Sequence, residues 1–501
     1  LDTEADSLVQ RPTSATDPVK AGVIVGHATF PHCGAPKQDR QKTSRGPMPR
    51  RLIALCLAML WATAHAAPQG DAPSTSGPVA FVHVNVVPMD HERILRNTTV
   101  LVRDGRIEAI GRSVPVPTGA RIIDGRGTAY LTPGLTDLHV HSDTREDLTN
   151  YLVNGVTRIV NMGDARPGFV ARVRPRANRG EIPGPQVDAA FIVDGSPRYA
   201  HLFVETPEQA RAVVGIAKTN GYRFIKVYND LSADAFAALA REAREQGLPV
   251  VGHGVTSVGL ERQIEAGQSL VAHAEEFLYT VFREPGSTAL PSAAKVKRTA
   301  AWLRQHGTYV TADLNTYATI AAQWGRPDVL AAYLDAPQAR VLAPEQRIEW
   351  QNSGYAKRTS PGIDDSRRFL ADFIKALDDA GVPLVMGTDA PSIPGLVPGF
   401  AVHDNLRALH EAGLTRYQSL STATRQPGAF FRQYVPGAEP FGTVEAGSRA
   451  DLVLSAGNPL EDLSHLRQPQ GVMVSGHWYP ADELRAMQEA LAQEYARSLP
   501  R

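Results

Sequence analysis

The 501-residue chain carries 52 Lys and Arg against 52 Asp and Glu, with 43% hydrophobic residues and two cysteines. This balance gives no general attraction to nucleic acid or to an anionic membrane, and the apolar fraction excludes a largely disordered chain and a multi-span membrane protein. Two cysteines are too few for a disulfide framework or a cysteine-rich zinc module.

Residues 48–66 have the layout of a secretory signal peptide. Arg50 and Arg51 form a positively charged start, residues 52–62 form an apolar stretch, and Ala-His-Ala at 64–66 fits a small-residue cleavage site. The apolar stretch is much shorter than the ~20 residues needed to span a bilayer. We therefore expect an exported protein, periplasmic or secreted, without stable membrane insertion.

Residues 1–47 precede this segment and show no apolar periodicity. Two interpretations remain open: a stretch that is not part of the natural product, or an unstructured leader. Cys33 and Cys56 both lie before residue 67, so the exported chain is expected to contain no cysteine. Any metal would then be bound by histidine, carboxylate or a lysine-derived group.

Both ends of the remaining chain have β character. Residues 80–87 and 100–110 are rich in β-branched residues, and Asp104-Gly105 is typical of a hairpin turn. Three further β segments are predicted near the C-terminus, at 442–446, 450–454 and 471–475, and residues 474–479 are interpreted as a turn flanked by strand-like residues. We expect one discontinuous β-sandwich domain built from 67–131 and 437–480. A final helix over 482–499, within a C-terminal segment 481–501, shows an apolar helical face.

Between these ends, short apolar strands alternate with helical segments. Thr206-Pro207 and Ser232 are helix-start signals, and Gly221 and Gly247 close the two helices they begin. Eight strands are predicted, one before His139 and the others at 157–161, 187–193, 224–228, 249–252, 270–273, 309–312 and 383–387. Alternation of this kind predicts an α/β fold, a (β/α)8 TIM-like barrel over 132–436. The long segment of about 315–381 is interpreted as an insertion over one end of the barrel.

Polar side chains fall at the ends of these strands, where barrel enzymes place their catalytic groups. His139 and His141 close the first strand, and their spacing puts both imidazoles on one face of an extended chain. His253, His273 and Asp389 close the fifth, sixth and eighth strands. Each has a structural alternative, a core histidine or a helix N-cap, but their joint placement predicts a metal site.

Lys226 lies inside the apolar fourth strand FIKVY. An edge lysine whose amine reaches solvent is the alternative explanation. A lysine within a buried strand is costly unless it is paired or modified. Lys226 therefore belongs with the predicted site.

Two longer segments resemble the amidohydrolase superfamily. Residues 122–141 (IIDGRGTAYLTPGLTDLHVH) look like its entry from the β domain into the barrel, and 442–459 (GTVEAGSRADLVLSAGNP) look like the return. IKVY around Lys226 and AHAEEF around His273 are similar to the prolidase-like and imidazolonepropionase-like branch, which includes dipeptidases, carboxypeptidase-like peptidases and ochratoxin-hydrolysing amidases.

The resemblance implies a binuclear metal centre. His139 and His141 would hold the more buried ion together with Asp389, while His253 and His273 would hold the second. Such a ligand set suits two divalent ions, Zn2+ above all, with Mn2+, Co2+ or Fe2+ as alternatives.

The resemblance also implies roles for the remaining site residues. Lys226 would carry a CO2-derived carbamate that bridges both ions, and Asp389 would act as general base and then acid. Tyr228, two residues beyond Lys226, is expected to hydrogen-bond the developing oxyanion, with a packed strand aromatic as the alternative. His201 and Arg198, in the loop after the third strand, are candidates for binding a substrate carboxylate.

The resulting prediction is a metal-dependent hydrolase of an amide or peptide bond. A dipeptidase, a carboxypeptidase-like enzyme or an amidase acting on N-acyl amino acids, including ochratoxin-type amides, would use a metal-bridging hydroxide. Two alternatives stay open: a hydrolase of cyclic amides, as in imidazolonepropionase-like enzymes, and a non-catalytic metal-binding protein. The partners expected are a small-molecule substrate, no nucleic acid and, by resemblance, further copies of the chain in a homo-oligomer.

Overall fold

The computed structural model describes residues 77–498, except 164, 200, 284–286 and 360. The predicted leader and signal peptide at 1–66 lie outside the described residues. Among the residues described, none of the helices combines the length and the apolar character that crossing a membrane requires.

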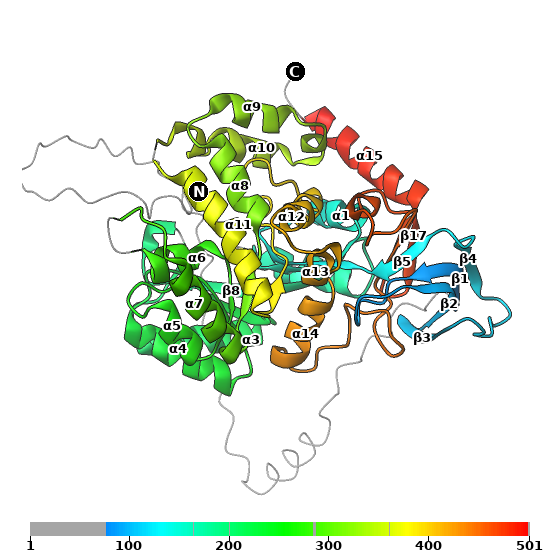
Figure 1. The fold of residues 1–501 in the computed structure, drawn as a ribbon, viewed down its shortest axis with the longest axis horizontal. Coiled ribbons are helices and arrows are strands. Elements are labelled where there is room, and N and C mark those ends of the chain that lie inside the picture. The colour runs from blue at the N-terminus through cyan, green and yellow to red at the C-terminus, as the bar shows by residue number, and fades with distance from the viewer. Residues whose placement is uncertain (1–76, 164, 200, 284–286, 360, 499–501) are drawn as a thin grey trace, which may run out of the picture. The chain divides into compact units, whose positions relative to one another are not determined.

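Eight parallel strands form the central sheet (Figure 1). They are β6 (Leu135–Val140), β7 (Val156–Asn161), β8 (Gln186–Asp194), β10 (Phe224–Val227), β11 (Val250–Gly252), β12 (Gln268–Val271), β13 (Tyr309–Thr311) and β14 (Leu384–Val385). The short β9 (Leu202–Phe203) pairs with β8.

The sheet closes on itself between its last and first strands. Val140 forms a parallel bridge with Ala390, the Leu138 N–H donates to the Met386 carbonyl at 2.9 Å, and the His141 N–H donates to that of Ala390 at 2.8 Å. The predicted (β/α)8 barrel is confirmed, and each of its eight strands overlaps a predicted one.

Helices follow the strands, and two of them begin where the sequence predicts. Thr206 accepts a hydrogen bond from the Gln209 N–H, and Ser232 accepts one from the Ala235 N–H, so both helices start with satisfied backbone donors. The helices outside the insertion are α1 (Arg145–Val153), α2 (Arg174–Asn178), α3 (Pro207–Thr219), α4 (Ala233–Glu245), α5 (Leu260–Glu265), α6 (Glu275–Phe277), α7 (Ala293–His306), α12 (Phe400–Glu411), α13 (Arg416–Thr422), α14 (Arg425–Tyr434) and α15 (Ala481–Ser498).

Among its described residues, the predicted insertion between β13 and β14 contains four α-helices. They are α8 (Leu314–Gln323), α9 (Pro327–Asp335), α10 (Pro344–Gln351) and α11 (Ile363–Asp379). Helix α10 is fixed to the loop after β14, because the Trp350 indole N–H and the Gln346 amide both donate to the Pro391 carbonyl, at 2.7 and 3.2 Å. The insertion thus borders the end of the barrel where strand β14 delivers Asp389.

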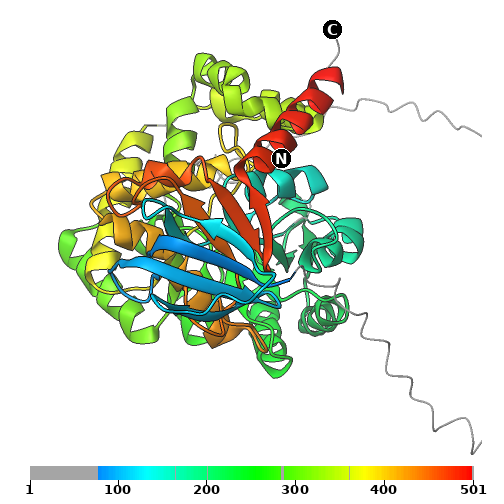
Figure 2. The same cartoon turned by 90° about the vertical axis from the view of Figure 1, so that its right-hand side faces the viewer.

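A second sheet joins the two ends of the described chain, as Figure 2 shows. Its strands are β1 (Val79–Val86), β2 (Leu95–Arg103), β3 (Arg106–Gly111), β4 (Arg121–Asp124), β5 (Tyr130–Pro133), β15 (Leu452–Ser455), β16 (Gly471–Val474) and β17 (His477–Pro480). Strand β5 pairs with both β1 and β15, and so connects the early strands to the late ones.

For this sheet, the structure confirms the predicted hairpin turn at Asp104-Gly105, but one predicted β segment, 442–446, is wrong. Asp104 and Gly105 both adopt positive φ, 50° and 73°, as a tight hairpin between β2 and β3 requires. The segment 442–446 forms no strand. Gly442, the first residue of the segment, and Gly447, the residue after it, have φ of 84° and 87°, so the backbone turns at both ends instead of extending.

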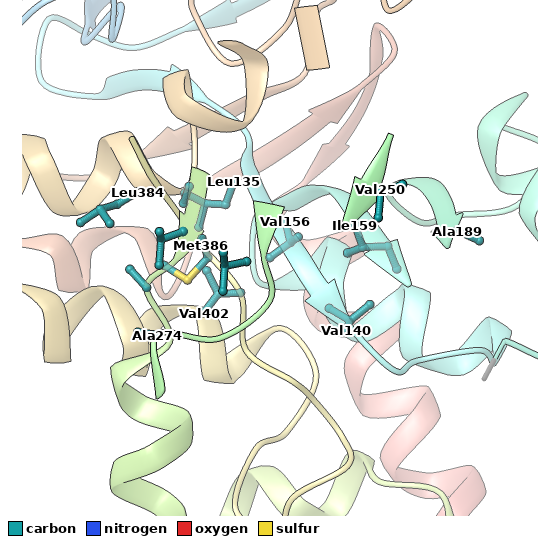
Figure 3. Close-up of a cluster of buried hydrophobic side chains, with 14 of the residues drawn as sticks. Leu135, Val140, Val156, Ile159, Ala189, Val250, Ala274, Leu384, Met386 and Val402 are labelled. Atoms are coloured by element: carbon teal, nitrogen blue, oxygen red, sulfur yellow. The ribbon is translucent and has the colours of Figure 1, made fainter. Parts of the chain in front are cut away.

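Alternation along the strands separates the two faces of the barrel wall. Ile225 packs into the outer layer beneath the helices, a cluster that includes Val156, Ile159 and Val250 (Figure 3). Phe224 belongs instead to the cluster inside the barrel. Because successive side chains point to opposite faces, Lys226 shares the inner face with Phe224.

Candidate metal centre

The six predicted ligands converge at the carboxyl ends of the barrel strands. Asp389 Oδ1 lies 3.2 Å from His139 Nε2 and 3.0 Å from His141 Nε2, and Lys226 Nζ lies 3.2 Å from His139 Nε2. Ligand atoms of His139, His273 and Asp389 all lie within 4.8 Å of one another. The structure therefore brings strands β6, β10, β12 and β14 to one point.

The two remaining histidines extend this cluster. The ring of His273 lies 4.4 Å from that of His139 and 5.0 Å from that of His253, measured between centroids. His139, His253 and His273 are each no more than 1% exposed. Only His141 is partly exposed, toward the adjoining cavity.

Three of these imidazoles are oriented through Nδ1. The Nδ1 of His253 lies 2.8 Å from Glu276 Oε1, that of His273 contacts Asp313 Oδ2, and that of His139 lies 3.2 Å from the Ala272 carbonyl. Carboxylates and carbonyls only accept hydrogen bonds, so each Nδ1 carries the proton. The Nε2 lone pair of each ring is then directed to the cluster, as in metal-ligating histidines.

Glu276 and Asp313 were not predicted from the sequence. Glu276 follows His273 by three residues in AHAEEF, and Asp313 comes two residues after strand β13. Their positions close to the ends of strands could have identified Glu276 and Asp313 in the sequence, because ligand histidines usually have carboxylate partners.

The protonation of the centre favours metal binding. Burial, together with the nearby amine of Lys226 and the other imidazoles, holds the pKa of His139 well below its usual range. His139 is therefore neutral at physiological pH, which is the form that donates a lone pair to a metal.

Asp137 is a further buried carboxyl beneath the centre that sequence inspection did not identify. Its oxygens accept from the Thr388 hydroxyl at 2.6 Å, from the Thr388 N–H at 3.1 Å and from the His139 N–H at 3.2 Å. Burial raises the pKa of Asp137 to about 7 against the opposing effect of these bonds. The contacts fix strand β6 to the segment that carries Asp389.

The backbone at Asp389 is constrained. Its φ of 61° is uncommon for a residue other than glycine, and such conformations cluster at functional sites. The Asp389 N–H donates to the His139 carbonyl at 2.8 Å. At Gly387 an added Cβ would lie 2.8 Å from the Cβ of His139 and 2.5 Å from a methyl of Thr311, so only glycine allows this approach.

A cavity of about 400 Å³ opens onto the centre and is lined by His141, Lys226 and Asp389. Tyr228 and His201, both predicted to act on substrate, line the same cavity. The Tyr228 ring is buried against His253 and His201, at centroid distances of 4.3 and 4.7 Å.

Arg198, the other predicted substrate-binding residue, is placed differently. It is exposed, its guanidinium lies 5.0 Å above the ring of Tyr199, and it is not part of the cavity lining. Its role in binding substrate stays a prediction, as do the roles of Tyr228 and His201.

The residues present fit a divalent metal site. Imidazole nitrogens directed inward, a carboxylate and a buried lysine are the donor chemistry of Zn2+ or a similar ion. The structure shows His and Asp side chains grouped closely enough to share a metal ion. The binding of two ions and the carbamate on Lys226 stay predictions.

Comparison with known families gives one extended match. The model of the amidohydrolase family matches residues 130–479, from the last strand before the barrel to the C-terminal sheet.

Among curated proteins, the chain is 26% identical over 189 residues to a dihydroorotase of Anaeromyxobacter dehalogenans, covering 36% of this chain and 37% of that protein. It is 35% identical over 184 residues to urease subunit alpha 2 of Streptomyces coelicolor, covering 34% and 31%. The chain thus spans about a third of the length of these curated relatives.

Solved structures match over most of the chain. Bottromycin amidohydrolase superposes with a TM-score of 0.66 at 24% identity, over 85% of this chain and 91% of that one. Ochratoxinase of A. niger gives 0.55 at 18% identity, over 81% and 96%, and a Xaa-Pro dipeptidase with bound methionine gives 0.60 at 18%, over 81% and 100%. At these identities the likeness concerns the fold.

Proposed function

Because the chain belongs to the amidohydrolase family, we propose that it hydrolyses an amide or peptide bond of a small molecule at the metal centre. Hydrolysis of carbon–nitrogen bonds is the chemistry of the family. The single observation that carries the proposal is the convergence of His139, His141, His273 and Asp389 with Lys226. Three of these residues, His141, Lys226 and Asp389, line one cavity.

The ligand assignment is the one predicted from the sequence. His139, His141 and Asp389 would hold one ion, and His253 and His273 would hold the other. Divalent ions bound there would supply Lewis acidity toward the scissile carbonyl and lower the pKa of water toward ~7.

Lys226 would bridge the two positions as a carbamate. The side chain is 1% exposed, and a buried ammonium so close to His139 adds positive charge at the place where cations must bind. Reaction of the neutral amine with CO2 replaces that charge with an anionic group, which explains a lysine at this position.

Asp389 would transfer the proton during the reaction. It would take a proton from the attacking water and deliver it to the leaving nitrogen. Its contacts with His139 and His141 and its constrained backbone hold the carboxylate at the centre, 3% exposed.

Tyr228 and His201 would bind the substrate. The Tyr228 hydroxyl would donate to the oxygen that becomes negative as water attacks. His201, whose ring lies against that of Tyr228, would meet a carboxylate next to the scissile amide. The names of the dipeptidase and ochratoxinase structures agree with substrates of this kind.

Screening of the metal-supplemented protein against dipeptides, N-acyl amino acids and cyclic amides tests the proposal. We expect turnover of open-chain amides. Hydrolysis of cyclic amides alone would support the cyclic-amide alternative. No turnover of any compound by the fully metal-loaded protein would support the non-catalytic metal-binding alternative. Lys226→Ala should lower the metal content per chain and remove turnover, and full metal occupancy in this variant would refute the bridging carbamate.

We further propose that the protein is exported through the signal peptide at 48–66 and acts as a homo-oligomer. N-terminal sequencing of the exported chain and light scattering test these two points. A mature chain that begins before Met48, or a monomer at working concentration, would contradict them.

A further inference from the structure

One part of the cavity lining is formed by helices α1 and α10 and is acidic. Glu345 and Glu349 come from α10, and Asp147 comes from the first turn of α1. Thus the insertion, which carries none of the proposed metal ligands, contributes charged groups to the cavity that contains them.

The two glutamates lie on one face of their helix. Residues four apart are neighbours on a helix surface, and both Glu345 and Glu349 line the cavity. Trp350 and Gln346 hold α10 to the Pro391 carbonyl, two residues beyond Asp389. The carboxylates are therefore held beside the reaction centre on a fixed helix. In the part of the chain that the structure describes, neither glutamate forms an ion pair.

Asp147 is the buried member of this set, only 8% exposed. Burial, together with the neighbouring charges of Asp143 and Glu146, raises its pKa to about 7 against the opposing effect of the hydroxyls of Thr144 and Ser142. Within the described ranges, no arginine or lysine forms an ion pair with Asp147. A cation that entered the cavity would relieve this burial cost.

The cationic side chains of the lining are already engaged. Arg166 forms a fork with Asp143, through Nε at 2.6 Å and Nη2 at 2.9 Å. Lys226 and His141 belong to the proposed metal centre, and His201 is assigned to the substrate carboxylate. The surface made by Asp147, Glu345 and Glu349, here called the acidic wall, therefore has an excess of negative charge.

A metal ion does not account for this excess. Among the described residues, the groups of three ligand atoms close enough to share an ion all include His273, and none includes a member of the acidic wall. Carboxylates distributed over a wall suit an extended organic cation with several N–H donors.

Resting on the proposed function, we propose that the substrate carries a cationic nitrogen, an alkylammonium or a guanidinium, that docks on Asp147, Glu345 and Glu349 while its amide lies at the metal centre. The acidic wall then determines specificity and takes no part in bond cleavage.

The cation has two possible sources, the free amino terminus of a peptide or a basic side chain. Both present N–H donors to carboxylates, so the wall alone does not separate them. Pairs of substrates that differ in only one of the two charges separate these sources. Gly-Lys compared with Gly-norleucine tests the side chain, and each peptide compared with its N-acetyl form tests the amino terminus.

The experiment measures kcat/KM of the metal-loaded protein for this series. In at least one of the two kinds of pair, kcat/KM of the cationic peptide should exceed that of its neutral counterpart by about tenfold or more. This is the size expected of one charge-assisted hydrogen bond. Glu349→Gln should lower that ratio and Glu349→Lys should invert it. Glu411→Gln, a surface change at the end of α12, should leave it unchanged. Equal rates within both pairs, or a ratio unaffected at Glu349, would overturn the proposal.

Binding separates this proposal from the proposed function. Titration calorimetry of the same peptides with the Asp389→Asn variant requires no turnover. A preference for the cationic peptide that Glu349→Gln removes supports the acidic wall, even if no amide is hydrolysed by the unmodified protein and the proposed function fails. Hydrolysis with no preference in binding would leave the proposed function intact and refute the acidic wall.

Discussion

The two ends of the barrel are built from the same strands but have opposite chemistry. At the amino end, Phe224 packs against Phe430 and Phe431 at centroid distances of 6.0 and 5.7 Å, and Tyr309 lies 5.1 Å from Phe430. At the carboxyl end, two residues after Phe224, Lys226 enters a cluster of imidazoles and a carboxylate. One end is closed by aromatic packing, and the other is left polar and opens onto a cavity.

The two ends of the barrel serve different purposes, stability at one and chemistry at the other. The aromatic end excludes water and supplies stability through buried area, since each such ring buries a large apolar surface. The polar end contains buried titratable groups that stabilise the fold little on their own and are expected where function requires them. Substitutions at the two ends should therefore separate activity from stability.

The largest effect is expected at Asp389. Asp389→Asn removes the proton acceptor but keeps the shape of the side chain, so kcat should fall by about 10²–10⁴-fold, the range attributed to general acid–base catalysis. The side-chain carbonyl oxygen of Asn can still bind the ion, so metal content and melting temperature should stay close to those of the unmodified protein. A variant with undiminished kcat would remove Asp389 from the mechanism.

The aromatic end should respond in the opposite way. Phe430→Ala deletes a ring that is 1% exposed and should lower the free energy of unfolding by about 3–5 kcal/mol. Urea denaturation measures this loss. At a temperature where the variant remains folded, metal content and KM should not change, and a change in KM at full stability would show that the two ends are not independent.

A buried histidine away from the cavity gives a pH-dependent contrast with the metal centre. Burial lowers the pKa of His403 to about 4 from 6.5, and its Nε2 lies 2.9 Å from the Asn154 carbonyl. Between those pH values the unfolded chain binds a proton that the folded chain does not. The stability contributed by neutral His403 is therefore complete above pH 6.5 and is lost as the pH falls toward 4.

Urea denaturation at pH 7.5 and at pH 5 tests this contrast. The unmodified protein should lose about 2 kcal/mol more than His403→Gln over this interval, from 1.36 kcal/mol per pH unit. An equal loss in both proteins would show that His403 does not titrate as its burial implies.

The smallest effect is expected at the carboxylate partner of His253. Glu276→Gln can still accept a hydrogen bond from Nδ1 but no longer offers a negative charge, so metal affinity should fall by about 10–100-fold. Competition with a chelator measures the affinity. Glu276→Asp, which keeps the charge, is the matched variant, and equal affinities in all three proteins would make Glu276 a packing residue.

Much of the polar end could be predicted from the sequence. Strand ends meet at one edge of a barrel, so His139, Lys226 and Asp389 could be grouped without coordinates. The family resemblance inferred from the motifs around these residues is confirmed by the family model over 130–479.

What could not be predicted depends on three-dimensional contacts. Asp313 meets His273 only because β12 and β13 are neighbours in the barrel, and Glu349 reaches the cavity only because α10 is held to Pro391 by Trp350. The segment 442–446 has strand-forming residues, but Gly442 at its start and Gly447 just after it turn the backbone. Tertiary contacts decide this conformation, and residue preferences alone do not predict it.

The sheet shared by the two ends of the described chain has a consequence for the order of folding. Ser455 pairs with Tyr130, which lies 325 positions earlier in the sequence, so strand β5 lacks one of its neighbours until strand β15 has been synthesised. Contacts of such long range are slow to form because a large loop must close first. The barrel lies entirely within that loop, and completion of the sheet is therefore a late event that depends on residues near the C-terminus.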